Sequence, residues 1–331
     1  MKKRFKKWIA VLMTALLVAS VFAACAKTEG EQPAGSDGKL SVVPTIFPEY
    51  DWVIQVLGDR AEAADVRMLL DNGADLHNYQ PTADDMIAIS TCDLFIYVGG
   101  ESDEWVEDAL ANATNQNMLT VNLLEALGSQ VKEEETVEGM QPEEEEADED
   151  EPEYDEHVWL SLKNAQQLVS VIAEKLGDAD PDYRQTYLDN AAAYSEQLAA
   201  LDGQYQAAVD AANVKTLGFG DRFPFRYMTD DYGLRYYAAF AGCSAETEAS
   251  FETVSFLSQK VDEYGLNYVM TIEGTDHKLA QTVVENTTAK TQQLLSLNSM
   301  QSVTAKDVEA GNTYLDIMQS NLTVLTQALN N

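Results

Sequence analysis

Two of the chain's three histidines stand in loops just ahead of helix-like segments, and imidazole is the side chain here best suited to metal chemistry. His77 lies in Asn-Gly-Ala-Asp-Leu-His-Asn-Tyr-Gln-Pro (72–81), and His157 lies in Glu-His-Val-Trp-Leu (156–160). A neutral imidazole nitrogen binds zinc and other divalent transition metals. The chain otherwise offers mainly oxygen ligands, with 56 Asp and Glu against 21 Lys and Arg. These two loops are therefore where a metal site would be built.

The elements that must hold these loops alternate between short apolar runs and helical patterns. In the first half, strands are expected at 40–46, 64–70, 94–98 and 118–121, with helices at 52–57, 82–91 and 104–112. In the second half, strands are expected at 216–219, 235–240, 268–272 and 294–297, with helices at 225–232, 251–264, 278–286 and 314–329. Such alternation predicts α/β architecture, with parallel sheets flanked by helices, in two lobes.

A long helix is expected between the two lobes, over residues 182–212. No proline interrupts this stretch after its first residues, and large or apolar side chains recur at steps of three and four: Tyr187, Ala191, Tyr194, Leu198, Leu201 and Tyr205. This spacing places them on one face of a helix. A helix of that length could brace both lobes.

Residues 1–24 have the pattern of a bacterial lipoprotein signal peptide. A basic start is followed by the apolar run 8–22, which is short for a permanent membrane span, and two alanines precede Cys25. We expect cleavage before Cys25, lipidation of that cysteine (palmitate), and a flexible tether over 25–39. An ordinary cleaved signal or an anchor helix is the alternative. The protein is thus expected on the outer face of the cell membrane, held there by its lipid.

The charge distribution limits which partners the protein can bind. A net charge of −35 argues against nucleic acid and anionic lipid as partners and favours cations, with solubility as the alternative reason for such acidity. Residues 132–156 contain 15 acidic residues and one lysine, so we expect a mobile acidic loop there. It either gathers cations near a site or is a solvated tether. The remaining domains are then an N-terminal lobe over 40–131, its end with the linking helix over 157–213, and a C-terminal lobe over 214–331.

Cysteine usage is low. Beyond Cys25 the chain has Cys92 and Cys243, one in each half. We expect two separate buried thiols; a disulfide outside the cytoplasm is the alternative. Their neighbours do not form a cysteine-rich zinc knuckle.

With these features in order, the chain resembles the metal-binding solute receptors of ABC transporters, the family of zinc and manganese uptake. The resemblance rests on Gly-Ala-Asp-Leu-His-Asn-Tyr-Gln-Pro (73–81), Asp-Leu-Phe-Ile-Tyr (93–97), His-Val-Trp-Leu (157–160) and Tyr-Leu-Asp-Ile-Met-Gln-Ser-Asn-Leu (314–322). It implies a metal cleft between two lobes and a receptor that passes its ion to an ABC permease. We expect a monomer.

The resemblance also implies ligands. The first two family positions match His77 and His157, and the third falls at Asp221, where zinc-type members usually have histidine and manganese-type members a carboxylate. The fourth falls at Asn298, or at Ser296 if the alignment slips. We expect the two histidines to come from opposite lobes and to meet within about 8 Å, since each metal–nitrogen bond is about 2.1 Å long.

A further carboxylate is needed, because the asparagine offers only a neutral oxygen. Glu273 is the candidate, since it follows the strand 268–272 and strand ends open into clefts in this architecture. A structural hydrogen bond is its alternative role, and Asp221 could cap a helix or pair with Arg222. Arg222 and Arg226 are expected to bridge carboxylates or to contact an anionic chelate, and His277 is expected to be exposed.

Zn²⁺ is the favoured ion because it binds most ligand sets more tightly than Mn²⁺, which remains the alternative. Imidazole ligation predicts weaker binding below about pH 6. The competing functions are a receptor of the same fold for a metal chelate, a metal-dependent surface hydrolase, and an adhesion lipoprotein that needs metal to fold. The chain has neither a His-Glu-x-x-His pair nor a Gly-x-Ser-x-Gly elbow, so we expect no enzyme.

Overall fold

The computed structural model describes residues 39–141, 153–244 and 248–330. Lys39–Asn331 forms one compact unit. The expected signal peptide, the lipidated Cys25 and most of the tether lie outside the described residues, as does the middle of the acidic segment, 142–152. Within the described part, we find no helix with both the length and the apolar character needed to cross a membrane.

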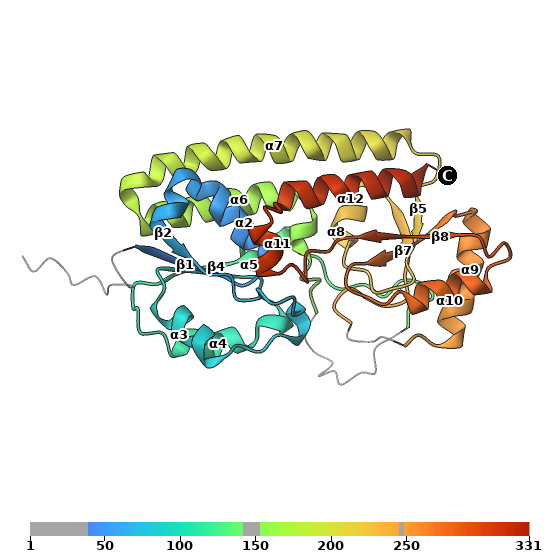
Figure 1. Ribbon diagram of the computed structural model, residues 1–331, viewed down its shortest axis with the longest axis horizontal. Coiled ribbons are helices and arrows are strands. Elements are labelled where there is room, and N and C mark those ends of the chain that lie inside the picture. Colours follow the sequence, from blue (N-terminus) through green and yellow to red (C-terminus); the bar gives the residue numbers. More distant parts are fainter. Residues whose placement is uncertain (1–38, 142–152, 245–247, 331) are drawn as a thin grey trace, which may run out of the picture. The chain divides into compact units, whose positions relative to one another are not determined.

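The first sheet is fully parallel, as the alternation of strands and helices predicts. It has the order β2-β1-β3-β4, formed by β1 (Leu40–Pro44), β2 (Ala64–Val66), β3 (Leu94–Tyr97) and β4 (Leu119–Asn122). Figure 1 shows α2 (Phe47–Leu57) on one side of this sheet and α3 (Ala83–Thr91) with α4 (Trp105–Ala111) on the other. The short α5 (Leu123–Leu127) follows β4. Because both faces are covered, the inner strand β3 reads as the apolar run Leu-Phe-Ile-Tyr.

The second half repeats this plan. Strand β5 (Thr216–Gly218) pairs in parallel with β6 (Arg235–Tyr237), and β7 (Tyr268–Ile272) pairs in parallel with β8 (Gln293–Leu297). A bridge between Phe219 and Met270 joins the two pairs, which gives the order β6-β5-β7-β8. The flanking helices are α8 (Arg226–Tyr232), α9 (Phe251–Tyr264) and α10 (Lys278–Asn286), followed by α11 (Ala305–Glu309). The α/β fold predicted from the sequence is confirmed.

Three helices pack together beside these sheets. The expected long helix is α7 (Arg184–Ala211), and it contacts α6 (Leu162–Ala179) and α12 (Tyr314–Leu329) (Figure 1). The tyrosines and leucines of its predicted stripe are all buried. The Tyr205 hydroxyl donates to the Met318 carbonyl at 2.7 Å, which ties α7 to α12. The helix spans roughly 42 Å at 1.5 Å per residue.

The site loops begin where the regular elements end. Strand β2 ends at Val66, earlier than the expected 70, and the chain then runs as a loop to a short 3₁₀ turn, Leu76–Asn78. Thr82 caps α3 as predicted, with Asp85 completing a capping box. The acidic segment is ordered at both ends, where Glu133 pairs with Tyr154 in an antiparallel bridge. Cys92 and Cys243 are not joined to each other.

Candidate metal centre

His77 and His157 face each other through their Nε2 atoms, which lie 3.2 Å apart. Two ligands in a tetrahedral zinc site, each about 2.0–2.1 Å from the ion, are roughly 3.3 Å from one another. The observed separation is therefore that of two ligands on one ion. The expected approach within about 8 Å is met. The expectation that the two come from opposite lobes is wrong, because His157 directly precedes α6, which packs on β3 and β4 of the first sheet.

The 3₁₀ turn Leu76–Asn78 orients His77. Asp75 caps this turn by accepting the His77 backbone N–H at 3.1 Å. The ring Nδ1 lies 2.7 Å from the Ser102 hydroxyl and 3.5 Å from a carboxylate oxygen of Glu156. These partners hold Nδ1 and leave Nε2 directed at His157. Burial, with the neighbouring His157 ring, lowers the pKa of His77 to about 3, so the imidazole is neutral and competent to bind metal at pH 7.

A carboxylate fixes His157, which is fully buried. One oxygen of Asp155 lies 2.9 Å from both the backbone nitrogen and the ring Nδ1 of His157. A carboxylate oxygen accepts, so the ring proton sits on Nδ1 and Nε2 carries the lone pair. Two residues on, the Trp159 ring N–H donates to the Ser299 carbonyl at 2.8 Å. Tyr314 donates to the Trp159 carbonyl at 2.7 Å, which anchors this turn in the core.

Cys243 is the third potential ligand, and it comes from the second half of the chain. His77, His157 and Cys243 each offer one ligand atom, and these three atoms lie within 4.8 Å of one another. Among the described residues, this is the one group of three or more His, Cys, Asp or Glu side chains that could hold a metal ion. Gly242 makes the approach possible, because a Cβ there would lie 3.0 Å from the His157 ring. Glu134 accepts the Cys243 backbone N–H at 3.0 Å. Burial raises the pKa of the Cys243 thiol well above its usual value, so it is protonated until a cation arrives.

An amide oxygen also reaches the centre. With the Gln301 amide turned so that its nitrogen donates to Asp75, its oxygen lies 3.0 Å from His157 Nε2, a contact that is favourable once a proton or a cation is at Nε2. Asp75 is held in turn by an ion pair with Arg222. Arg222 thus bridges a carboxylate, one of the two roles expected for it. Arg226 does the same with Glu135 and Asp230.

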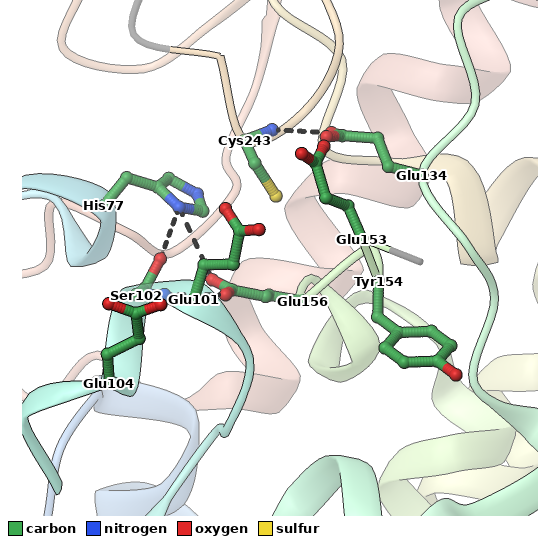
Figure 2. Close-up of a pocket in the computed structure, with 9 residues that line it drawn as sticks. All are labelled: His77, Glu101, Ser102, Glu104, Glu134, Glu153, Tyr154, Glu156 and Cys243. Carbon is green, nitrogen blue, oxygen red and sulfur yellow. Dashed lines mark hydrogen bonds and ion pairs between the residues drawn. The ribbon is translucent and has the colours of Figure 1, made fainter. Parts of the chain in front are cut away.

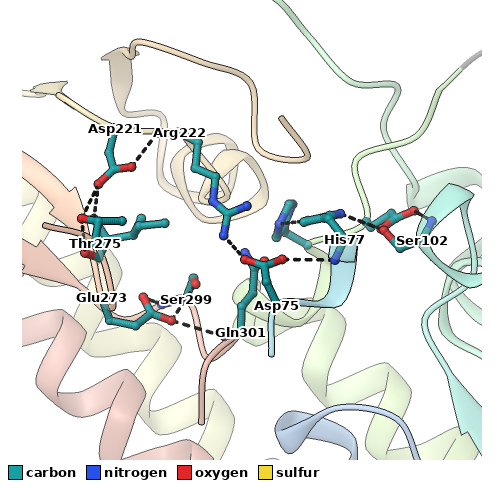
Figure 3. Close-up of polar contacts among 12 residues, drawn as sticks. Asp75, His77, Ser102, Asp221, Arg222, Glu273, Thr275, Ser299 and Gln301 are labelled. Atoms are coloured by element: carbon teal, nitrogen blue, oxygen red, sulfur yellow. Dashed lines mark hydrogen bonds and ion pairs between the residues drawn. The ribbon is translucent and has the colours of Figure 1, made fainter. Parts of the chain in front are cut away.

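The two predicted carboxylate ligands are engaged outside this group. Asp221 accepts from the Ile272 backbone at 3.3 Å and from the Thr275 hydroxyl at 3.0 Å. Glu273 accepts from the Ser299 backbone at 2.7 Å and hydroxyl at 2.8 Å. In the view of Figure 3, Arg222 and Asp75 lie between Asp221 and His77.

The other predicted residues are also occupied. Asn298 accepts the Met300 N–H at 2.8 Å, and Ser296 hydrogen bonds to Thr271 at 2.6 Å. His277, expected to be exposed, is half-buried and its Nδ1 lies 2.9 Å from the Thr275 hydroxyl.

The residues that sequence reasoning missed are Cys243, Asp155 and Gln301. The signal for the cysteine was its place in Gly-Cys-Ser, just after an expected strand, in a chain poor in nitrogen ligands. Asp155 stands two residues before a predicted ligand, where an orienting carboxylate is common. Nothing in the sequence singled out Gln301.

Two parallel-sheet α/β halves around a partly buried group of two imidazoles and a thiol define a protein of the metal-binding class. Comparison with known proteins then gives the family: the description "Zinc-uptake complex component A periplasmic" (ZnuA) matches residues 42–328, and the chain belongs to this family. Since the family consists of uptake components, the prediction of a protein that is not an enzyme is confirmed.

The relatives include the zinc-binding lipoprotein AdcA of Streptococcus pneumoniae, 32% identical over 96% of this chain and 60% of that protein. The chain therefore spans about 60% of the length of the streptococcal relatives it matches. The high-affinity zinc uptake system protein ZnuA of Bacillus subtilis is 30% identical over 98% of both chains. Among solved structures, the Zn(II)-bound ZnuA-like domain of S. pneumoniae AdcA is similar, with a TM-score of 0.69, 30% identity, and coverage of 89% of this chain and all of that one.

Proposed function

We propose that this chain is a lipid-anchored receptor outside the cytoplasm that captures Zn²⁺ and delivers it to an ABC permease. The observation that carries the proposal is the pair of Nε2 atoms 3.2 Å apart, each on a ring whose Nδ1 is held by another group. Two lone pairs facing each other in a buried site repel unless a proton or a cation lies between them. A cation of zinc's size fits this spacing.

Our proposed ligands are His77, His157 and Cys243, with the Gln301 oxygen as a fourth donor. Asp221 and Glu273, proposed from the sequence, stay in consideration as ligands of a rearranged, ion-bound form. For either to bind the ion, it would have to give up hydrogen bonds to backbone groups around Ile272 and Ser299. The thiol needs no such rearrangement, which is why we favour it.

The thiol also bears on the choice of metal. Soft thiolate ligands select zinc over manganese, whereas carboxylate and carbonyl oxygens suit manganese. A site with two imidazoles and a thiolate is therefore a zinc site. The zinc-bound structure of the related AdcA domain supports this assignment.

The membrane anchor and the permease rest on the relatives. One of them is called a lipoprotein and another is named as part of a high-affinity zinc uptake system. Cys25 follows the signal-peptide pattern, so we assign the lipid to that residue. We propose that the chain acts as a monomer.

A receptor for a metal chelate is less well supported. A cavity of about 750 Å³ beside the centre is lined by three residues of basic type, Arg222, His277 and Lys278. However, Arg222 is paired with Asp75 and Lys278 with Asp276, so the cavity does not hold an uncompensated positive charge for an anionic ligand.

The test is the metal content of the full chain, purified without an affinity tag or chelator. We expect one zinc per chain, lost in His77→Ala and in Cys243→Ala and kept in Asp221→Asn and Glu273→Gln. If only the two carboxylate variants lose zinc, then Asp221 and Glu273 are ligands and the Cys243 thiol is not. A ligand at 1,000 times its Kd stabilises the folded protein by about 4 kcal/mol, so metal binding should raise the thermal unfolding midpoint. If no divalent ion raises the midpoint of the dialysed protein, the proposed receptor function is wrong.

A further inference from the structure

A cavity of about 310 Å³ adjoins the metal centre (Figure 2). His77 and Cys243, two of the three proposed ligands, form part of its wall. The cavity therefore reaches two of the three proposed ligand residues.

The rest of the wall is acidic. Among the residues that the structure describes, no lysine or arginine lines the cavity, whereas five glutamates do: Glu101, Glu104, Glu134, Glu153 and Glu156. They come from two separate parts of the chain, the turn after β3 and the two ordered ends of the acidic segment. Figure 2 shows the carboxylates of Glu101, Glu134 and Glu153 directed toward the same space as the Cys243 thiol. Glu101, Glu104 and Glu153 are exposed, so the cavity reaches the protein surface.

A second observation indicates a cation at the inner end. Glu156 is 2% exposed, and its Oε1 accepts the Ser102 N–H at 2.9 Å. Its buried Oε2 has no hydrogen-bond partner and lies 3.5 Å from His77 Nδ1. A buried carboxylate oxygen without a donor is costly unless positive charge comes near it. The inner wall of the cavity thus lacks the charge that a cation would supply.

We propose that this acidic cavity is the route by which hydrated Zn²⁺ reaches the centre, with its glutamates accelerating capture rather than holding the bound ion. The inference rests on the proposed zinc-receptor function. A cleft lined by charge of one sign focuses the electric field and raises the local concentration of the opposite ion, which increases association rates by about 10- to 1,000-fold. Exposed carboxylates bind a hydrated ion weakly, so the buried imidazole and thiol ligands can take it from them.

The variant that tests this is the triple substitution Glu101→Gln, Glu104→Gln and Glu153→Gln. These three positions are exposed, whereas Glu134 holds the Cys243 backbone and Glu156 holds Ser102. The matched control removes three charges from the exposed face of α7, which contributes no residue to the cavity: Asp189→Asn, Glu196→Gln and Asp210→Asn.

The measurement is stopped-flow binding of Zn²⁺ to the full chain at several salt concentrations, followed by the fluorescence of Trp159, whose ring centroid lies 5.2 Å from that of His157. For the cavity triple we expect association roughly tenfold slower at low salt, a weaker salt dependence and an unchanged dissociation rate. The control should change association by less than about twofold.

Equal slowing by both triples would overturn the route, because net charge alone would then explain it. Faster dissociation in the cavity triple, with unchanged association, would also overturn it, since the glutamates would then belong to the bound state. If the unsubstituted chain binds no zinc, the receptor function itself is wrong. If it binds zinc but the two triples behave alike, only the proposed route is wrong.

Discussion

Asp155 offers a sharp test of how the centre works, because it contacts His157 twice and is not itself a proposed ligand. One of its oxygens lies 2.9 Å from both the backbone nitrogen and the ring Nδ1 of His157. The substitution Asp155→Asn keeps the shape and removes the charge. If the amide turns its NH₂ group toward the ring, Nδ1 must become the acceptor, and the proton moves to Nε2, where it blocks metal binding.

The magnitude follows from these contacts. Carboxylates that orient a metal-binding histidine are worth about 10- to 100-fold in metal affinity, or about 1.4–2.8 kcal/mol. Asp155 is 2% exposed and accepts two hydrogen bonds from one residue, so we expect the upper part of that range. Zinc affinity is measured by competition with a chromophoric chelator, and circular dichroism confirms that the variant is folded.

The control is Asp189→Asn, an equivalent change on the exposed face of α7, for which we expect no effect. A folded Asp155→Asn protein whose zinc affinity falls by less than about threefold would refute the reasoning, because His157 would then need no carboxylate to present Nε2.

The remaining predictions concern the thiol, the pH dependence and the fold. Cys243→Ser should lower the preference for zinc over manganese, and Co²⁺ bound to it should lack the sulfur charge-transfer absorption that the parent shows; a band of equal strength in both would exclude the thiol. Because burial raises the pKa of Cys243, binding should release its proton, and zinc affinity should fall about tenfold for each unit of pH below neutrality, a slope that titration should find abolished in Cys243→Ser. Gly242→Ala should weaken zinc binding at least tenfold in equilibrium titrations, since its Cβ would press on the His157 ring. Burial raises the pKa of Glu49 to about 8, above its unfolded value, so its contribution to stability is complete below about pH 4.5 and declines as the pH rises to 8. In urea unfolding, the free energy of unfolding of Glu49→Gln should therefore rise relative to that of the parent by several kcal/mol between pH 5 and 8. A difference that stays constant with pH would refute this.

Local patterns were enough to predict most of the fold. Helices α9 and α10 begin and end where their periodicity and flanking residues indicate, and the buried stripe of α7 was readable from its three- and four-residue steps. Three elements differ most from the expected bounds: α2 begins at Phe47 instead of residue 52, β6 ends at Tyr237 instead of residue 240, and β2 ends at Val66 instead of residue 70. The backbone at Leu69 and Leu70 still donates to Pro44 and Thr45, but beyond Val66 it leaves the regular ladder to carry the loop with His77.

The site was harder to predict, because most of it depends on contacts between distant segments. The two histidines were visible, since the sequence has only three and histidine is the commonest metal ligand. Asp155 and Glu156 stand at the end of an acidic run that predicts solvent exposure, yet both are 2% exposed. The role of Cys243 depends on Gly242 lying against the His157 ring, a tertiary contact that no local pattern encodes.

Arg222 poses the question of how a cation site tolerates a guanidinium nearby, and the answer lies in its pairing. Its charge is balanced by Asp75, whose other contacts are the His77 backbone and the Gln301 amide. The Arg222–Asp75 ion pair is therefore close to neutral from the position of the ligands. Its geometry still sets the positions of the His77 backbone and the Gln301 amide at the centre. Breaking it by Arg222→Met would leave the half-buried Asp75 with an uncompensated charge, free to turn toward the ion. That variant should bind zinc with altered affinity but an unchanged thiolate absorption with Co²⁺, which separates positioning by Arg222 from ligation by Cys243.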